Sequence, residues 1–290
     1  MYKNAAKDGK STVAVAAAAD AHVLEAVGAA RDMADFILIG DGSAIRSISE
    51  KVGVDISEME IVDEPDNEKA CKHAVSLVKS GTVGTLMKGL VDTSVIMKAV
   101  LDKEAGMRTD RKLSHLAFFQ LAAYHKPLFI TDAAINIAPD FDALKHIILN
   151  AVESVRKLGV PKPKVALLAA KEKPDPKMPV TMVAAELKNA YKNGEIPGCV
   201  LDGPLALDNA VSRESAEIKG INSLVAGDAD ILVCPNIESG NILYKSLAFL
   251  ADAKNGGIVL GAKKPIILTS RADSAENKLI SIALGILSGR

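Results

Sequence analysis

Short apolar runs rich in β-branched residues alternate along the chain with segments whose apolar positions recur every three or four residues. The short runs predict buried strands, and the periodic segments predict amphipathic helices. In the first hundred residues this pattern predicts four strand–helix units, with strands at 12–19, 36–39, 59–62 and 82–87 and helices at 21–33, 43–52, 67–79 and 93–103. Such a series predicts a parallel sheet with helices on both faces.

The alternation changes after residue 103. A basic loop at 106–112 precedes two consecutive strand-like runs, 113–123 and 127–137. Such an irregular pair of strands in mid-chain indicates either a point where the chain passes from one domain to the other or an oligomer interface. A long helix at 140–158 follows, and the remaining apolar runs predict strands at 165–170, 199–201, 231–234, 258–260 and 265–269.

The end of the last predicted strand carries an arginine. Ser270-Arg271 follows the strand, and a helical pattern begins a few residues later. Asp273 and Glu276 have the spacing of an N-cap pair for that helix. In open α/β sheets ligands lie at this point, and helix N-termini favour anions. An anion-binding arginine and a surface arginine beside an ordinary cap both fit the pattern.

Composition supports an α/β chain. At 290 residues, length slightly favours two domains over one. Hydrophobic residues make up 49% of the chain but aromatic residues only 3%, with no Trp. The core must therefore consist of Ala, Val, Ile and Leu, which suits parallel strands covered by Ala-rich helices.

Charge and cysteine usage disfavour several classes of protein. The net charge of −1 does not call for a nucleic-acid or anionic-membrane partner. Cys71, Cys199 and Cys234 form no C-x-x-C, and the histidines lack metal-ligand spacing, so we expect neither disulfides nor a metal site. Apolar runs are too short for a membrane span. The run at 13–19 predicts a first strand rather than a signal segment, which favours a cytoplasmic, reducing compartment.

Familiar catalytic motifs are missing. The sequence contains no G-x-S-x-G and no phosphate-binding G-x-x-x-x-G-K-[ST]. Gly40-Asp41-Gly42 begins like a dinucleotide fingerprint but lacks the third glycine, so we interpret it as a strand-to-helix turn.

Polar clusters at strand ends are the remaining candidates for substrate binding. Lys88-Gly89 and Thr93-Ser94 follow the fourth predicted strand. Glycine lets a ligand approach the backbone, and the polar side chains can contact phosphate oxygens. An ordinary turn with a capping Thr is the alternative. Asp202 and Asp208 follow a later strand, where they are either substrate ligands or turn formers.

A further cluster follows Cys234 and contains Asn236, Gly240, Asn241 and Lys245. Gly240 and Asn241 are poor choices early in a helix, so a close ligand or packing partner explains them better than helix propensity. Cys234 itself is expected to be a buried thiol, because no base is evident near it. Together these clusters suit catalysis by positioning and charge stabilisation of phosphate-bearing substrates.

Five longer segments resemble a known family: LMKGLVDTSVIMKAVL (86–101), KPLFITDAAINIAPD (126–140), LDGPLALDNAV (201–211), AGDADILVCPNIESGNILYK (226–245) and ILTSRADSAENKL (267–279). They resemble the phosphate acetyl/butyryl transferase family, most closely its butyryltransferase branch. The resemblance extends from about residue 10 to the end of the chain.

The resemblance implies two doubly wound α/β lobes, as in isocitrate and isopropylmalate dehydrogenases, with the active site in the cleft between them. We expect residues 1–137 plus 274–290 in the first lobe and 138–273 in the second. The implied reaction is reversible transfer of a short- or branched-chain acyl group between coenzyme A and inorganic phosphate. Coenzyme A would be a substrate rather than a permanently bound cofactor. A homo-oligomer, dimeric or larger, is also implied.

The resemblance also assigns roles to residues. In the family, the pair matching Ser270-Arg271 contacts substrate at the reacting centre. The acetyltransferase branch has an aspartate, proposed to take the thiol proton of coenzyme A, where this chain has Asn277, next to Glu276. This difference leaves the base open between Asp273, Glu276 and bound phosphate. Lys88 and the Arg108/Arg111 loop are candidates for the phosphates of coenzyme A.

Other functions fit parts of the pattern. A phosphate acetyltransferase differs only in its acyl chain. A two-lobed nucleotide-dependent dehydrogenase requires an intact cofactor motif and usually an acidic metal cluster, which the sequence lacks. A non-enzymatic small-anion binding protein would share the fold without turning over acyl-CoA.

Overall fold

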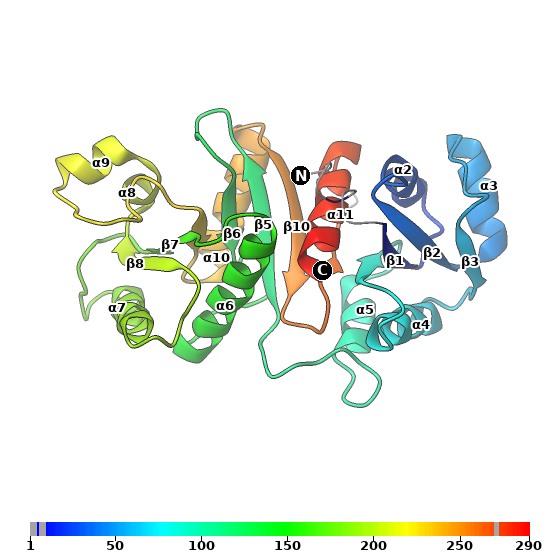
Figure 1. The fold of residues 1–290 in the computed structure, drawn as a ribbon, viewed down its shortest axis with the longest axis horizontal. Helices are drawn as coiled ribbons and strands as arrows, with labels where there is room; N and C mark the ends of the chain where they lie inside the picture. The colour runs from blue at the N-terminus through cyan, green and yellow to red at the C-terminus, as the bar shows by residue number, and fades with distance from the viewer. Residues whose placement is uncertain (1–4, 6–9, 270–272) are drawn as a thin grey trace. The chain divides into compact units, whose positions relative to one another are not determined.

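The structure is a computed structural model that describes residue 5, residues 10–269 and residues 273–290. The chain forms two compact units, unit 1 (Met1–Arg111 and Gly256–Arg290) and unit 2 (Lys112–Asn255). These boundaries differ from the lobes expected from the sequence, 1–137 plus 274–290 and 138–273. The difference arises because the mid-chain strand pair folds with unit 2, whereas residues 256–273 return to unit 1. Figure 1 shows the elements of both units.

Unit 1 contains a mostly parallel sheet. Its strand order is β3-β2-β1-β4-β11-β10, and only β10 pairs antiparallel with its neighbour. The strands are β1 (Ser11–Ala16), β2 (Ala34–Gly40), β3 (Glu60–Asp63), β4 (Thr85–Lys88), β10 (Lys254–Leu260) and β11 (Ile266–Ile267).

Helices cover both faces of this sheet. They are α2 (Ala21–Ala29), α3 (Gly42–Val52), α4 (Asn67–Lys79), α5 (Thr93–Val100) and α11 (Ala275–Gly289). Helices α2, α3 and α11 lie on one face, and α4 and α5 pack together on the other (Figure 1). Asp20, Asp41 and Asp66 each precede a helix and accept a hydrogen bond from its first turn, which explains where α2, α3 and α4 begin.

Unit 2 has the sheet order β5-β6-β9-β7-β8. Strands β5 and β6 are the two consecutive mid-chain strands that the sequence predicts; they pair antiparallel, and the other neighbours are parallel. The strands are β5 (Ser114–Gln120), β6 (Leu128–Thr131), β7 (Lys164–Leu168), β8 (Val200–Leu205) and β9 (Ile231–Val233). The helices are α6 (Phe141–Lys157), α7 (Pro179–Lys192), α8 (Leu207–Val211), α9 (Arg213–Ile218), α10 (Ile237–Lys245) and the π-helical turn η1 (Ser246–Leu250).

The core of unit 2 is mostly aliphatic, as composition predicts, but it also buries Phe118, Phe119 and Phe129. Helices α6 and α7 contact each other over the sheet. A separate hydrophobic cluster joins α8 and α10 to the strands through buried Ala210, Leu232 and Phe119, with Leu243 and Tyr244 packed against it. Each unit is thus an α/β unit whose parallel strands all present their carboxyl ends along one edge, where ligands bind in such folds.

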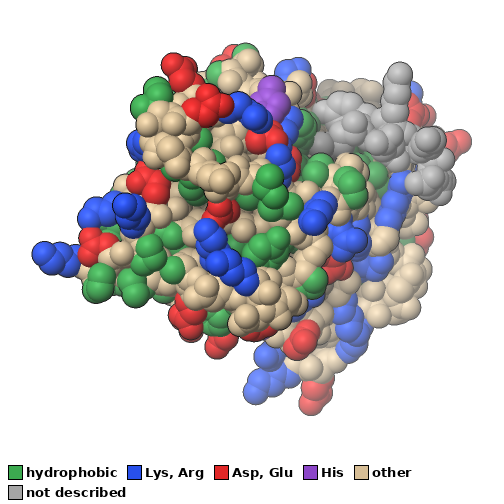
Figure 2. All heavy atoms as spheres, turned by 60° about the vertical axis from the view of Figure 1, so that its left-hand side comes forward, with side chains coloured by type: hydrophobic (Ala, Val, Ile, Leu, Met, Phe, Trp, Pro, Cys, Tyr) green, Lys and Arg blue, Asp and Glu red, His purple; other side chains and the backbone are tan. Residues whose placement is uncertain are grey.

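Charges are mixed on the face of the molecule that Figure 2 shows. Lys and Arg side chains are interspersed with Asp and Glu, and neither sign dominates among the described residues. Among the residues that the structure describes, no helix has both the length and the apolar composition of a membrane span.

Candidate active site

The turn after β4 lies against the turn after β1 in unit 1. The Gly89 amide donates to the Ala16 carbonyl (2.8 Å), and Leu90 donates to Ala17 (2.8 Å). A Cβ on Gly89 would lie only 2.1 Å from the Ala17 oxygen, so no other residue fits without moving the backbone. Ala17 has a φ of +56°, which is uncommon for a residue with a Cβ and is found most often at functional sites.

Lys88 holds this turn from inside. Its side chain is 9% exposed, and Nζ donates to the carbonyls of Gly89 (3.1 Å) and Val91 (3.0 Å). Two main-chain acceptors compensate part of the cost of burying the ammonium. The ammonium therefore fixes the chain just before α5.

Helix α5 begins beside Lys88 with little capping. Asp92 occupies the N-cap position, but its side chain makes no capping hydrogen bond. Thr93 and Ser94 form the exposed first turn. Thr93 is therefore not the cap that the alternative interpretation required. The amides of an uncapped helix N-terminus are suited to an anion.

The amino end of α11 follows β11, the neighbour of β4. Ser270 and Arg271 lie outside the described residues. The predicted N-cap pair of Asp273 and Glu276 is wrong, because the helix begins at Ala275 and Ser274 accepts the hydrogen bond from the Asn277 amide (3.2 Å). Asp273 and Asn277 are half-buried and Glu276 is exposed.

Asn277 is held through its backbone. The Ser281 hydroxyl donates to the Asn277 carbonyl (3.0 Å) and accepts from the Gly257 amide of β10 (3.0 Å). Sequence reasoning missed the next residue, Lys278, which is buried on α11 and donates from Nζ to the Asp273 carbonyl (2.8 Å). A lysine that directly follows the candidate residues Glu276 and Asn277, just before the apolar part of the helix, was the signal that could have identified it.

In unit 2 the first turn of α10 packs on the end of β6. Asn236 is the N-cap and accepts from the Ser239 amide (2.9 Å). A Cβ on Gly240 would lie 2.2 Å from the Asp132 carbonyl oxygen, and Asn241 donates to the Ala133 carbonyl (3.2 Å). A packing partner for Gly240 and Asn241 is thus confirmed, and that partner is the main chain after β6.

Asp132 is the second residue that the sequence interpretation missed. Its side chain is 2% exposed and accepts hydrogen bonds from the amides of Ala134 (2.9 Å) and Ile135 (3.0 Å) and from Asn136 Nδ2 (2.6 Å). These bonds fold the turn that receives α10. The sequence interpretation missed it because the strand was predicted at 127–137, whereas β6 ends at Thr131 and leaves Asp132 at the strand end.

Cys234 lies at the end of β9 and is 2% exposed. Burial raises the pKa of its thiol to about 12, and the Asp132 carboxylate acts in the same direction. Burial likewise raises the pKa of Cys71 and Cys199 to about 11. All three cysteines are therefore neutral thiols near pH 7, which agrees with the expectation that Cys234 is not a nucleophile.

Asp202 and Asp208 are engaged in local ion pairs. Asp202 lies within β8 rather than at its end and pairs with Lys188 of α7. Burial would raise the pKa of Asp202, but hydrogen bonds from Lys188, Ser223 and the Gly203 amide lower it below the usual range. Asp208 pairs with Lys219 (3.0 Å), which lowers its pKa.

The remaining candidates lie on exposed segments. Arg108 is exposed and Arg111 half-buried, on a loop tied within unit 1 by the Thr109 hydroxyl and the Gly261 carbonyl (2.5 Å). Lys245 ends α10, with Nζ 5.2 Å from the centroid of the Tyr244 ring. Among the described candidates, Lys88, Gly89, Thr93 and Ser94 follow β4, and Asp273, Glu276 and Asn277 lie at the start of α11. In unit 2, Asn236, Gly240 and Asn241 lie at the start of α10, against the turn after β6. Arg108, Arg111, Asp202, Asp208 and Lys245 lie outside these groups.

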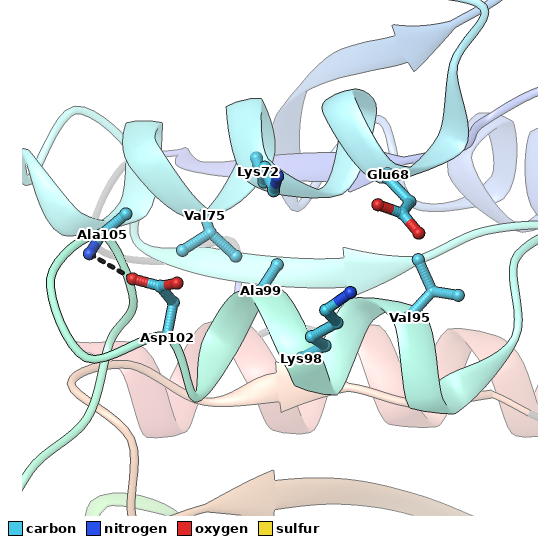
Figure 3. Close-up of a pocket in the computed structure, with 8 residues that line it drawn as sticks. All are labelled: Glu68, Lys72, Val75, Val95, Lys98, Ala99, Asp102 and Ala105. Carbon is cyan, nitrogen blue, oxygen red and sulfur yellow. Dashed lines mark hydrogen bonds between the residues drawn. The ribbon is translucent and has the colours of Figure 1, made fainter.

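A pocket on the α4–α5 face is separate from these strand ends (Figure 3). Its volume is about 160 Å³, and it is lined by Glu68, Lys72, Val75, Val95, Lys98, Ala99, Asp102 and Ala105. Sites for drug-sized ligands span roughly 300–1,000 Å³. The pocket is small for coenzyme A and contains none of the predicted site residues.

Comparisons with known proteins define the class. A sequence model described as "Phosphate acetyl/butaryl transferase" matches residues 65–286, so the chain belongs to this family. It is 48% identical over 277 residues to a phosphate butyryltransferase of Clostridium acetobutylicum, covering 95% of this chain and 92% of the relative. It is 45% identical over 251 residues to a phosphate acetyltransferase of Rhizobium meliloti, covering 87% and 79%.

Solved structures agree with this assignment. A branched-chain phosphotransacylase from Enterococcus faecalis superposes with a TM-score of 0.84 at 36% identity, covering 96% of this chain and 98% of that one. The expected family and α/β fold class are confirmed.

Proposed function

We propose that this protein is a phosphate acyltransferase that moves a short- or branched-chain acyl group, with butyryl as the best-fitting example, between coenzyme A and inorganic phosphate. The similarity to phosphate butyryltransferases along 95% of the chain carries the proposal. The uncapped amino end of α5 in unit 1 is compatible with substrates that carry phosphate.

The proposed chemistry is direct transfer. An oxygen of phosphate attacks the thioester carbonyl carbon, and the carbonyl electrons move onto its oxygen. Collapse of this intermediate breaks the carbon–sulfur bond, and the electron pair leaves on the thiolate of coenzyme A, which then takes a proton. The products are an acyl phosphate and free coenzyme A. The neutral Cys234 thiol, with its pKa near 12, supports a route without a covalent cysteine.

In this direct route, the main role of the protein is to stabilise the negative charge that develops during the reaction. Developing negative charge on the carbonyl oxygen is stabilised best by donors already in place. We propose that Ser270 and Arg271 contact the reacting atoms, while Lys88, Gly89, Thr93 and Ser94 contribute to binding. Arg108 and Arg111 are proposed for the phosphates of coenzyme A.

The proposal extends to the cellular setting. Three buried free cysteines are compatible with a reducing compartment, so we propose a cytoplasmic enzyme of short-chain fatty acid metabolism. We also propose a homo-oligomer, dimeric or larger, which the mass of the protein in solution tests.

A thiol-release assay tests the proposed reaction. Acetyl-, propionyl-, butyryl- and isobutyryl-CoA are supplied with and without phosphate, and the acyl phosphate is detected separately. We expect release only with phosphate, fastest with butyryl- or isobutyryl-CoA. Equal release without phosphate would indicate a thioesterase, and a clear preference for acetyl-CoA would make the chain a phosphate acetyltransferase.

A further inference from the structure

Lys278 occupies a position that is unfavourable for a cation on two counts. It is the fourth residue of α11, where the partial positive charge of the helix N-terminus repels an ammonium. Its side chain is also only 3% exposed, although charged groups are rarely buried without a partner of opposite charge. A leucine or methionine at this position would avoid both costs.

The contacts of Lys278 do not neutralise it. Nζ donates to the Asp273 carbonyl at 2.8 Å, which is a neutral acceptor. Across residues 10–269 and 273–290, no carboxylate forms an ion pair with this ammonium. A sequence that departs from local rules in this way is typical of a functional site.

The other end of the same helix provides a contrast. Lys264 Nζ donates to the Gly289 carbonyl (2.5 Å), at the carboxyl end of α11, where a cation is favourable. Lys264 is only half-buried. Anchoring of a helix-end carbonyl thus explains Lys264 fully, but it does not explain a buried charge at the amino end.

We propose that Lys278 is the buried positive charge that sets the affinity for inorganic phosphate at the amino end of α11. The inference rests on the proposed function. The proposed function puts Ser270 and Arg271, which shortly precede this helix in the sequence, in contact with the reacting atoms, so under that function the phosphate lies near this turn. The ammonium acts through space and through the Asp273 carbonyl, without contacting the anion itself. The phosphate dianion supplies the counter-charge that the described protein groups do not.

Three variants of Lys278 separate charge from hydrogen bonding. Lys278→Arg keeps the charge, Lys278→Gln keeps a donor without charge, and Lys278→Met keeps neither. Lys264→Met is the matched control, since it removes the same kind of bond from the other end of α11. Each purified protein is assayed for KM of phosphate, KM of butyryl-CoA and kcat, and thermal unfolding checks the fold.

We expect KM for phosphate to rise about tenfold or more in both the Gln and Met variants, with KM for butyryl-CoA little changed. Lys278→Arg and Lys264→Met should stay near the wild type. A wild-type KM for phosphate in Lys278→Gln would show that Lys278 acts only as a hydrogen-bond donor and would overturn the proposal. A rise in KM for butyryl-CoA alone would overturn it as well. If Met fails to fold, the Gln and Arg variants still decide. An inactive wild type would instead overturn the proposed function, and this inference with it.

Discussion

The α-carbon of Gly240 in α10 lies against the main-chain carbonyl of Asp132, and a Cβ there would be 2.2 Å from the oxygen. Relief of this clash would require the main chain to move, because both contacting groups belong to the backbone. Gly240→Ala should therefore separate α10 from the turn after β6 and destabilise the protein by about 1–3 kcal/mol. Urea unfolding measures this. Gly84→Ala is the control, since its nearest atom would lie at 3.7 Å, and a comparable loss in that variant would contradict the explanation.

Removal of the Cys234 thiol should leave catalysis largely intact. Burial raises the pKa of this thiol to about 12, so the reactive thiolate is scarce at neutral pH. Cys234→Ala should keep most of the wild-type kcat/KM in the thiol-release assay. Complete loss of activity in a variant that unfolds at the normal temperature would instead indicate a covalent cysteine intermediate.

The sequence predicted elements best where local signals agree. Helix α4 was predicted at 67–79 and spans Asn67–Lys79, because Asp66 caps it and its apolar positions keep one period. Strand β8 was predicted only to residue 201 but continues to Leu205, since Gly203-Pro204 has the composition of a turn. Helix α7 was not predicted, because its first residue, Pro179, closes a Lys- and Pro-rich stretch that resembles a loop.

Site prediction failed where partners are distant in sequence. Asp202 was selected as a strand-end residue, but the longer β8 places it mid-strand, and Lys188 on α7 pairs with it. The importance of Asp132 depends on Gly240, more than a hundred residues away, which no local pattern reveals. Ser274 was not predicted as the N-cap of α11, because Asp273 beside it has an equal propensity for the N-cap position.

Arg271→Lys should be far from conservative. Lysine keeps the charge but loses the planar fork that holds phosphate or carbonyl oxygens at two points. We expect kcat/KM to fall by about 10²-fold, the loss typical of one oxyanion donor, with the unfolding temperature unchanged. Near-wild-type turnover would remove Arg271 from the reacting centre.

Asp228 should stabilise unit 2 in a pH-dependent way. It binds Lys126 (2.9 Å), His125 (2.8 Å) and Lys164. Burial alone would raise its pKa, but these hydrogen bonds outweigh burial and hold the pKa well below the ordinary 3.8. Because the folded pKa is lowered, the stabilisation is complete above about pH 4 and is lost as the pH falls below it.

Asp228→Asn should therefore lower the urea midpoint at pH 7, and the difference from the wild type should shrink in acid. Asp35→Asn serves as the control, since Asp35 is exposed and its Lys10 partner lies 3.5 Å away. A difference that stays constant from pH 7 down to pH 3 would show that the Asp228 charge is not the cause.

At the start of α11, we expect one residue to orient the substrate and a neighbouring group to transfer the proton. A neutral amide cannot take a proton near neutral pH, so Asn277 cannot be the general base. In the direction that forms acyl phosphate, the thiolate leaves, and an ordinary thiol of pKa about 8.5 is already partly ionised near neutrality. Asn277 is then expected to orient the sulfur or the carbonyl, while Glu276, Asp273 or bound phosphate handles the proton.

The kinetics of single variants separate these roles. Removal of a general base costs about 10²–10⁴-fold, so Glu276→Gln should lower kcat by that amount and flatten its dependence on pH between roughly 6 and 8. Asn277→Ala should cost less and leave the shape of the pH profile unchanged, because the Ser274 cap and the Ser281 contact hold the backbone at this position. Loss of all activity in Asn277→Ala, with Glu276→Gln and Asp273→Asn both active, would reverse the assignment.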